Sequence, residues 1–249
     1  DQPMYSSKGL WNFVQQRPLE GFVFAVAPFN FTAIAGNLAT APAIMGNTIL
    51  LKPASSCVYT PYLFMQILKE AGMPDGVINF VPGSGSMVGK VCLDHKDLGG
   101  IHFTGSTRVF HQMWQTVGEN IAKYKSYPRI VGETGGKDFV MVHNSANAAE
   151  VATALTRGAF EFQGQKCSAA SRAYVPESLW PAVKEILVEQ VNSFKQGSPE
   201  DPSNFVNAVI SERAFDRIAG YIDYVKAQPD AEIITGGTYD KSVGYYISP

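Results

Sequence analysis

Three residues of this chain carry side chains that together suit nucleophilic chemistry at a carbonyl carbon. Cys167 lies in EFQGQKCSAA, where small neighbours leave room for a substrate and Lys166 would favour the thiolate. Glu133, directly before Thr-Gly-Gly, has the carboxylate of a general base. Asn30, in APFNFTA, has an amide that can donate to a developing oxyanion. A thiolate, a base and an oxyanion donor are the groups that such a reaction requires.

These residues also have purely structural readings, which the local pattern leaves open. Asparagine is common in turns after strands, and a glutamate beside glycines is often only an exposed side chain. A structural cysteine normally sits among apolar residues, and Cys167 does not. Cys57 and Cys92 lack the setting of Cys167, so we interpret them as structural.

Two further segments suit a ligand with sugar and phosphate groups. Lys52 ends the apolar run NTILLKP, and in open α/β sheets ligands bind outside the carboxyl ends of the strands, where a lysine can hydrogen-bond a ribose. In FTGST, Gly105 lets the backbone come close, and Ser106 can cap the next helix, whose first N–H groups favour an anion. A surface lysine and a plain capped helix are the alternatives.

The elements that must position these residues alternate along the chain. Short apolar runs, which indicate strands, are followed by longer amphipathic runs, which indicate helices, and this order is typical of a parallel, doubly wound sheet in an α/β protein. The alternation of strand-like and helix-like runs changes near the double glycine at 135–136, where we place a domain boundary. The predicted strands are 21–29, 47–53, 76–83, 99–106, 171–176 and 231–235, and the predicted helices are 37–46, 60–72, 107–124, 147–162, 177–195 and 211–227.

Composition excludes several classes of function. The 249 residues carry a net charge of −2 without a basic stripe, which argues against a nucleic-acid partner. No apolar run is long enough to span a bilayer, so we expect no membrane segment. The three cysteines are far apart and the four histidines are scattered, so we expect reduced thiols and no metal site.

Five motifs taken together resemble the aldehyde dehydrogenase superfamily. They are PFNF around Asn30, LLKPA around Lys52, FTGS around Gly105, GETGGK around Glu133 and GQKCSA around Cys167, in the family's order. The resemblance implies a doubly wound, parallel-sheet cofactor domain followed by part of an α/β catalytic domain. It also implies an NAD-dependent enzyme.

Within the superfamily the chain most resembles the Δ1-pyrroline-5-carboxylate dehydrogenase group, through FNFTAIAGNLATAPAIMGNTILLKP, EFQGQKCSAASRAYVPESLWP and SVGYYISP. The implied reaction is the oxidation of L-glutamate γ-semialdehyde to L-glutamate in proline catabolism, through a cysteine thiohemiacetal and thioester. Cys167 would be the nucleophile, Glu133 would activate water, and Asn30 would hold the oxyanion with the Cys167 N–H.

The resemblance also assigns binding residues. Phe31, Lys166 and Ser168 would shape the semialdehyde pocket. With Ser55 where some relatives carry a ribose-binding acid, NADP is not excluded, although NAD is favoured. The implied cofactor-binding residues are Ala27, Lys52, Gly105, Ser106, Thr107, Arg108 and Val109.

The superfamily is normally about twice as long, so the chain resembles an internal fragment that alone would be inactive. We expect residues 1–20 to be the tail of oligomerisation strands, 21–137 an NAD-binding domain lacking its N-terminal part, and 138–249 a catalytic domain lacking its C-terminal part. These strands indicate a homo-oligomer. The group occurs in bacterial cytoplasm, which we favour, and in the mitochondrial matrix.

Other functions stay open at this point. Another semialdehyde dehydrogenase, or the dehydrogenase part of a bifunctional proline-utilisation protein, would carry the same motifs. A cofactor-free hydrolase could use the same cysteine, glutamate and asparagine, and its turnover and stability would not respond to a nicotinamide. A non-catalytic scaffold fits less well, because all three side chains are present.

Overall fold

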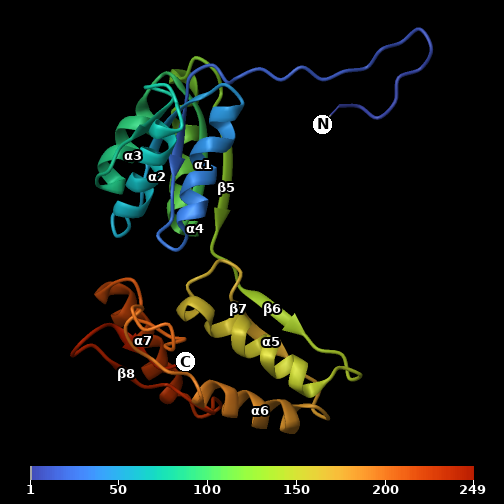
Figure 1. Cartoon of the computed structure of the whole chain (residues 1–249), viewed down its shortest axis with the longest axis vertical. Helices are drawn as coiled ribbons and strands as arrows, with labels where there is room; N and C mark the ends of the chain where they lie inside the picture. Colours follow the sequence, from blue (N-terminus) through green and yellow to red (C-terminus); the bar gives the residue numbers. More distant parts are fainter. Residues whose placement is uncertain (1) are drawn as a thin grey trace. The chain divides into compact units, whose positions relative to one another are not determined.

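The computed structural model describes residues 2–249, and the chain passes from one compact unit to a second between Thr134 and Gly135 (Figure 1). This junction lies within the Thr-Gly-Gly segment, close to the boundary predicted between residues 137 and 138. Each unit has its own apolar core and is described by itself. The cofactor-binding and catalytic roles of the two units remain predictions.

The first unit is built on a five-stranded parallel sheet with the order β3-β2-β1-β4-β5. Its central strands are short apolar runs that are buried on both faces, as parallel strands usually are. The strands are β1 (Phe22–Val26), β2 (Thr48–Lys52), β3 (Ile78–Phe80), β4 (Leu98–Gly105) and β5 (Arg129–Thr134).

Helices cover both faces of this sheet, because alternate strand residues point to opposite sides. Val23 and Ala25 of β1 pack with α1 and α2, whereas Phe24 packs with α3 and α4. This arrangement confirms the predicted doubly wound α/β sheet. The helices are α1 (Thr32–Ile44), α2 (Tyr59–Glu70), α3 (Gly85–Asp94) and α4 (Thr107–Glu119), and a 3-10 turn, η1 (Ile121–Lys123), follows.

Residues 2–20 contain no strand. The segment is mostly exposed and is closed on itself by bonds such as Gln2 Nε2 to the Val14 carbonyl at 2.8 Å. A strand exists only when a neighbour accepts its backbone hydrogen bonds. The oligomerisation role of this segment remains a prediction.

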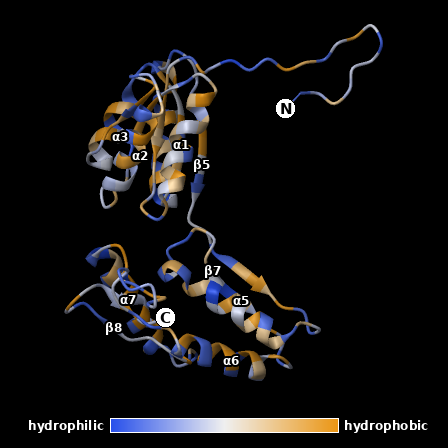
Figure 2. Cartoon of the chain, in the orientation of Figure 1, coloured by the Kyte–Doolittle hydropathy of each residue, from blue (hydrophilic) through white to orange (hydrophobic). Residues whose placement is uncertain are grey.

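The second unit packs helices on a pair of parallel strands, β6 (Asp138–Met141) and β7 (Ala170–Tyr174). Val140 joins the core formed with α5 (Ala148–Phe160) and α6 (Trp180–Asn192). Figure 2 shows β6 as a hydrophobic stretch, and Phe139 and Met141 are exposed on it. A 3-10 turn, η2 (Glu161–Gly164), follows α5, and α7 (Glu212–Lys226), β8 (Tyr239–Asp240) and β9 (Tyr246–Ile247) complete the unit.

One predicted strand is wrong. Residues 231–235, AEIIT, read as a strand, but the structure gives them no regular element. Ile233 is 37% exposed, and no strand lies alongside it in the described residues. Apolar, β-branched composition does not make a strand unless the fold provides a partner for it.

Candidate active site

The order of the strands opens a crevice at one edge of the first unit's sheet. The loop after β1 leads to α1 on one face, and the loop after β4 leads to α4 on the other face, although β1 and β4 are neighbours. Ligands of open α/β sheets bind at such a switch point. Asn30 follows β1, Ser106 follows β4, Lys52 ends β2 and Glu133 is near the end of β5. The fold therefore gathers these four residues at the carboxyl edge.

Asn30 and Phe31 form the link between β1 and α1. Asn30 is half-buried, and Phe31 is 37% exposed with an extended backbone that starts the helix. Ala27 extends the sheet by one residue, since its N–H donates to the Lys52 carbonyl at 3.0 Å. The backbone at this corner is therefore fixed by the strands, which holds the asparagine at the start of α1.

Lys52 is buried, so the surface-lysine alternative is wrong. Its side chain lies at the carboxyl edge with the residue only 6% exposed, and Nζ donates to the Pro53 carbonyl at 2.7 Å. Burial lowers the pKa of this amine from its usual range, because the charged form loses hydration. A buried ammonium group has donors to offer to a polar ligand, and one of them is used by Pro53.

Ser106 caps α4 as predicted, because its hydroxyl oxygen accepts from the Val109 N–H at 3.3 Å. Thr107 and Arg108, in the first turn, are exposed. The first N–H groups of a helix carry a partial positive charge, which suits a phosphate. The cap itself is confirmed, and the binding of an anion there remains a prediction.

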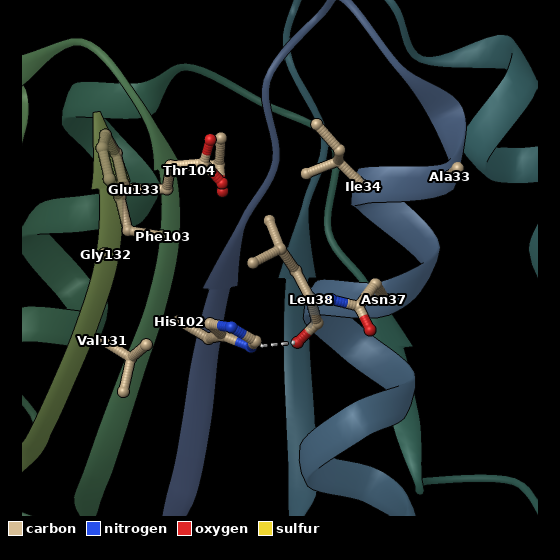
Figure 3. A pocket seen from close by; sticks show the side chains of 10 residues that line it. All are labelled: Ala33, Ile34, Asn37, Leu38, His102, Phe103, Thr104, Val131, Gly132 and Glu133. Carbon is tan, nitrogen blue, oxygen red and sulfur yellow. Dashed lines mark hydrogen bonds between the residues drawn. The ribbon is translucent and has the colours of Figure 1, made fainter. Parts of the chain in front are cut away.

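Glu133 lines a pocket of about 370 Å³ between α1 and the strands β4 and β5 (Figure 3). His102 and Thr104 on β4 and Val131 and Glu133 on β5 share one sheet face, because the register pairs Thr104 with Glu133. A pocket of this volume is large enough for a small organic molecule. The remaining lining residues are Ala33, Ile34, Asn37, Leu38, Phe103 and Gly132.

The polar residues that share this pocket with Glu133 were not predicted from the sequence. Figure 3 shows the His102 ring directed toward α1, where its Nδ1 lies 3.0 Å from the Leu38 carbonyl oxygen. Because a carbonyl only accepts, Nδ1 carries the proton and Nε2 is left as the acceptor in the neutral ring. The alternation of GIHFTG, with His102 two residues before Thr104, was the available signal.

Cys167 belongs to the second unit, in a turn where the Ala169 N–H donates to the Lys166 carbonyl at 3.3 Å. The cysteine is half-buried, and Ser168 beside it is exposed. Gly136 lies against this turn so closely that a Cβ added to it would be 2.6 Å from the Cys167 carbonyl oxygen. The second glycine of GETGGK is therefore required by its contact with the cysteine turn.

Lys166 forms an ion pair with Glu161 and is not an unpaired cation beside the thiol. Glu161 also accepts from Arg157 Nη2 at 2.5 Å. These two cations hold the pKa of the Glu161 carboxyl below its usual range through hydrogen bonds and charge, with Lys166 the larger cause. The positive charge that the sequence suggested would favour the Cys167 thiolate is thus offset by a neighbouring carboxylate.

The other two cysteines have different surroundings. Cys92 is buried in the core of the first unit, and burial raises the pKa of its thiol to about 11. Cys57 is half-buried, with its sulfur 3.3 Å from Thr60 Oγ1. Among the described residues, no group of three or more His, Cys, Asp or Glu side chains is placed to hold a metal ion. No helix of residues 2–249 is long and apolar enough to cross a membrane.

Comparisons with known proteins identify the family of this chain. The aldehyde dehydrogenase family model matches residues 1–249. The mitochondrial delta-1-pyrroline-5-carboxylate dehydrogenase of Dictyostelium discoideum is 52% identical over 250 residues, which cover 100% of this chain and 45% of that protein.

Solved structures show the same relationship. A Delta-pyrroline-5-carboxylate dehydrogenase from Mycobacterium tuberculosis, bound with NAD, superposes with a TM-score of 0.94 at 50% identity, over 100% of this chain and 46% of that one. Proline utilization A from Bdellovibrio bacteriovorus superposes with a TM-score of 0.84 at 32% identity, over 93% of this chain and 24% of that one. The chain spans about half the length of the dehydrogenases that it matches. It belongs to the aldehyde dehydrogenase family.

Proposed function

We propose that the protein to which this chain belongs oxidises L-glutamate γ-semialdehyde to L-glutamate with NAD. The observation that carries the proposal is the 52% identity, over the whole chain, to a delta-1-pyrroline-5-carboxylate dehydrogenase. The chain carries a cysteine, a glutamate and an asparagine, which are the side-chain types that this reaction requires, and the position of Asn30 and Glu133 at the carboxyl edge of the sheet supports the proposal. We further propose a homo-oligomer in a bacterial cytoplasm or a mitochondrial matrix.

The first unit fits a dinucleotide. A buried amine at the end of β2 and an exposed, capped helix start after β4 are donors of the kind that a ribose hydroxyl and a pyrophosphate accept from. Lys52 would hold the ribose, and Gly105 to Val109, with the backbone near Ala27, would form the cofactor wall. When bound, the nicotinamide supplies the acceptor for the hydride that the substrate loses.

The chain's own residues then divide the chemistry into two steps. The Cys167 thiolate attacks the aldehyde carbon and forms a thiohemiacetal, whose oxyanion accepts hydrogen bonds from the Asn30 amide and the Cys167 N–H. Loss of the hydride leaves a thioester on Cys167. Glu133 takes a proton from water, the water oxygen attacks the thioester carbon, and the thiolate departs as the acid forms. Phe31 and Ser168 would shape the pocket for the semialdehyde.

The test uses the full-length protein, with NADH formation measured on glutamate semialdehyde. Cys167→Ala should abolish turnover, because it removes the sulfur that would form the thioester, while Cys57→Ala is the matched control and should retain it. Turnover that survives Cys167→Ala would overturn the proposal. So would turnover that depends on Cys167 but does not reduce NAD. The second outcome would favour the hydrolase alternative.

A second candidate is the dehydrogenase part of a longer proline-utilisation protein, which the superposition on proline utilization A favours. The two candidates share the reaction and differ in what else the polypeptide carries. Oxidation of proline by the purified full-length protein, with a bound flavin visible in its absorption spectrum, would select this candidate. Oxidation of the semialdehyde alone would select the first.

A further inference from the structure

The turn before Cys167 holds its backbone in an unusual conformation. Phe162 (φ 53°), Gln163 (φ 56°) and Gly164 (φ 67°) are three consecutive left-handed residues. Only glycine adopts this region freely, and for other residues the Cβ approaches the following carbonyl. Such backbone persists only where surrounding contacts fix it, and it gathers at sites where positioning matters. Phe162 and Gln163 therefore require contacts that hold them.

The ion pairs around Glu161 supply the first of these contacts. Glu161 lies directly before the three left-handed residues and Lys166 lies two residues after them, so their ion pair joins the two ends of this segment. Arg157, one helical turn earlier on α5, fixes the other carboxylate oxygen at 2.5 Å. We call Arg157, Glu161 and Lys166 the Glu161 clamp. Lys166 directly precedes Cys167 in the chain, so the clamp fixes the residue next to the nucleophile.

The glutamines supply a second set of contacts. Gln165 Oε1 accepts from the Ile210 N–H at 3.0 Å. The Gln163 amide, turned so that its oxygen faces the backbone of Asn207, accepts from that N–H at 2.8 Å. Both bonds tie the turn to the segment that leads into α7. The turn is thus held along its length by residues 207–210 and across its ends by the clamp.

We propose that Glu161 and Lys166 are positioning residues that hold residues 162–164 in their left-handed form and so fix the place of the Cys167 sulfur. This inference rests on the function proposed above. A carboxylate paired with two cations, in a segment that is only partly exposed, retains directional hydrogen bonds. Because the Lys166 charge is offset by Glu161, its main effect on the cysteine is on position.

The proposal distinguishes Lys166 from a residue that contacts substrate or raises thiolate content. If the clamp acts as one unit, removing either partner has the same effect, and removing both has no further effect. If Lys166 instead acts directly on the thiol or on the substrate, Lys166 and Glu161 variants differ from one another. Lys166→Arg, which keeps the ion pair, should rescue function under the clamp model.

The experiment compares Glu161→Gln, Lys166→Met, their double variant and Lys166→Arg in the full-length protein. Lys241→Met is the matched control, because Lys241 also joins two partners, Glu212 and Asp216, in an ion cluster of the same unit. Two readouts are needed: kcat and KM for the semialdehyde, and amide hydrogen exchange over residues 161–169, which reports opening of the turn without any catalysis.

We expect kcat to fall about tenfold in both single variants and in the double variant, with KM for NAD unchanged. Hydrogen exchange over residues 161–169 should become about tenfold faster in the same variants. Lys166→Arg and Lys241→Met should match the parent. Lys166→Met also provides the test if Glu161→Gln fails to fold.

Two results would overturn the clamp. One is exchange at the parent rate in Glu161→Gln and Lys166→Met. The other is losses in kcat that multiply in the double variant. If the parent protein has no dehydrogenase activity, the proposed function fails, and hydrogen exchange alone still decides whether the clamp holds the turn.

Discussion

Substitution by alanine should have different effects at the two glycines of the Thr-Gly-Gly segment, with the larger effect at Gly136. Neither Gly135 nor Gly136 has a positive φ, so alanine suits the backbone at both positions. A Cβ at 136 would lie 2.6 Å from the Cys167 carbonyl oxygen and 3.1 Å from Asp138 Oδ2, whereas a Cβ at 135 meets no atom within 4 Å. Backbone does not rotate out of the way as a side-chain end does, so the cysteine turn must move.

The required movement sets the size of the effect. The 2.6 Å contact must open by about 0.8 Å or more to reach ordinary packing, and inserting a methyl group into a close contact costs about 1–3 kcal/mol. Misplacement of a reacting group by about 1 Å can reduce turnover about 100-fold. We therefore expect Gly136→Ala to lower kcat by about 10- to 100-fold, with a loss of about 1–3 kcal/mol in the free energy of unfolding.

The assay is urea unfolding together with kcat on the semialdehyde, in matched Gly135→Ala and Gly136→Ala variants of the full-length protein. Alkylation of Cys167 by iodoacetamide, followed by mass spectrometry, adds a readout that does not depend on the proposed reaction. Gly135→Ala should stay within about 0.5 kcal/mol of the parent. Equal behaviour of the two variants in all three measurements would refute the reasoning.

Two more substitutions test the first unit. Lys52→Met should raise the free energy of unfolding by about 1 kcal/mol at neutral pH, because it removes a charge whose burial is unfavourable. It should also weaken NAD binding, because it removes the amine that would hold the ribose. Since burial lowers the Lys52 pKa in the folded state, this gain should vanish as the pH approaches the ordinary lysine pKa of about 10.4; denaturation from pH 7 to 10.5 checks it. Gly132→Ala places a Cβ 2.2 Å from the Phe110 ring, which stacks on Phe103, and should cost about 1–3 kcal/mol in urea without changing Cys167 alkylation.

The sheet could be predicted from the sequence because each of its strands is marked by a pattern of apolar residues within a few neighbouring positions. The buried runs around Val23, Ile49 and Ile101 are apolar on both faces, and the helices α2, α3 and α4 each carry one apolar side. The Ser106 cap is also local, since the serine and the Val109 N–H are three residues apart. Residues 231–235 look equally strand-like, but a strand also depends on a neighbour that the local pattern does not contain.

The sequence indicates which residue types the candidate site contains, but it does not show which residues contact one another there. Nothing in FQG indicates left-handed backbone at Phe162 and Gln163, because local preference opposes it and hydrogen bonds to residues 207–210 supply the reason. The pairing of Lys166 with Glu161 was missed for a related reason. A lysine beside a cysteine suggests activation of the thiol, and only the fold shows the carboxylate that it meets.

The strand order determines when each strand of the first unit can find its neighbours during synthesis of the chain. Phe22 of β1 pairs with Thr48 of β2 and with Leu98 of β4, so one side of this central strand stays open until the chain has been synthesised beyond Leu98. During that interval this central strand exposes apolar residues and unpaired backbone groups, which favours pairing between nascent chains. Slow translation through residues 53–97 should therefore increase aggregation, and a chaperone that covers β1 during this interval should increase the soluble yield.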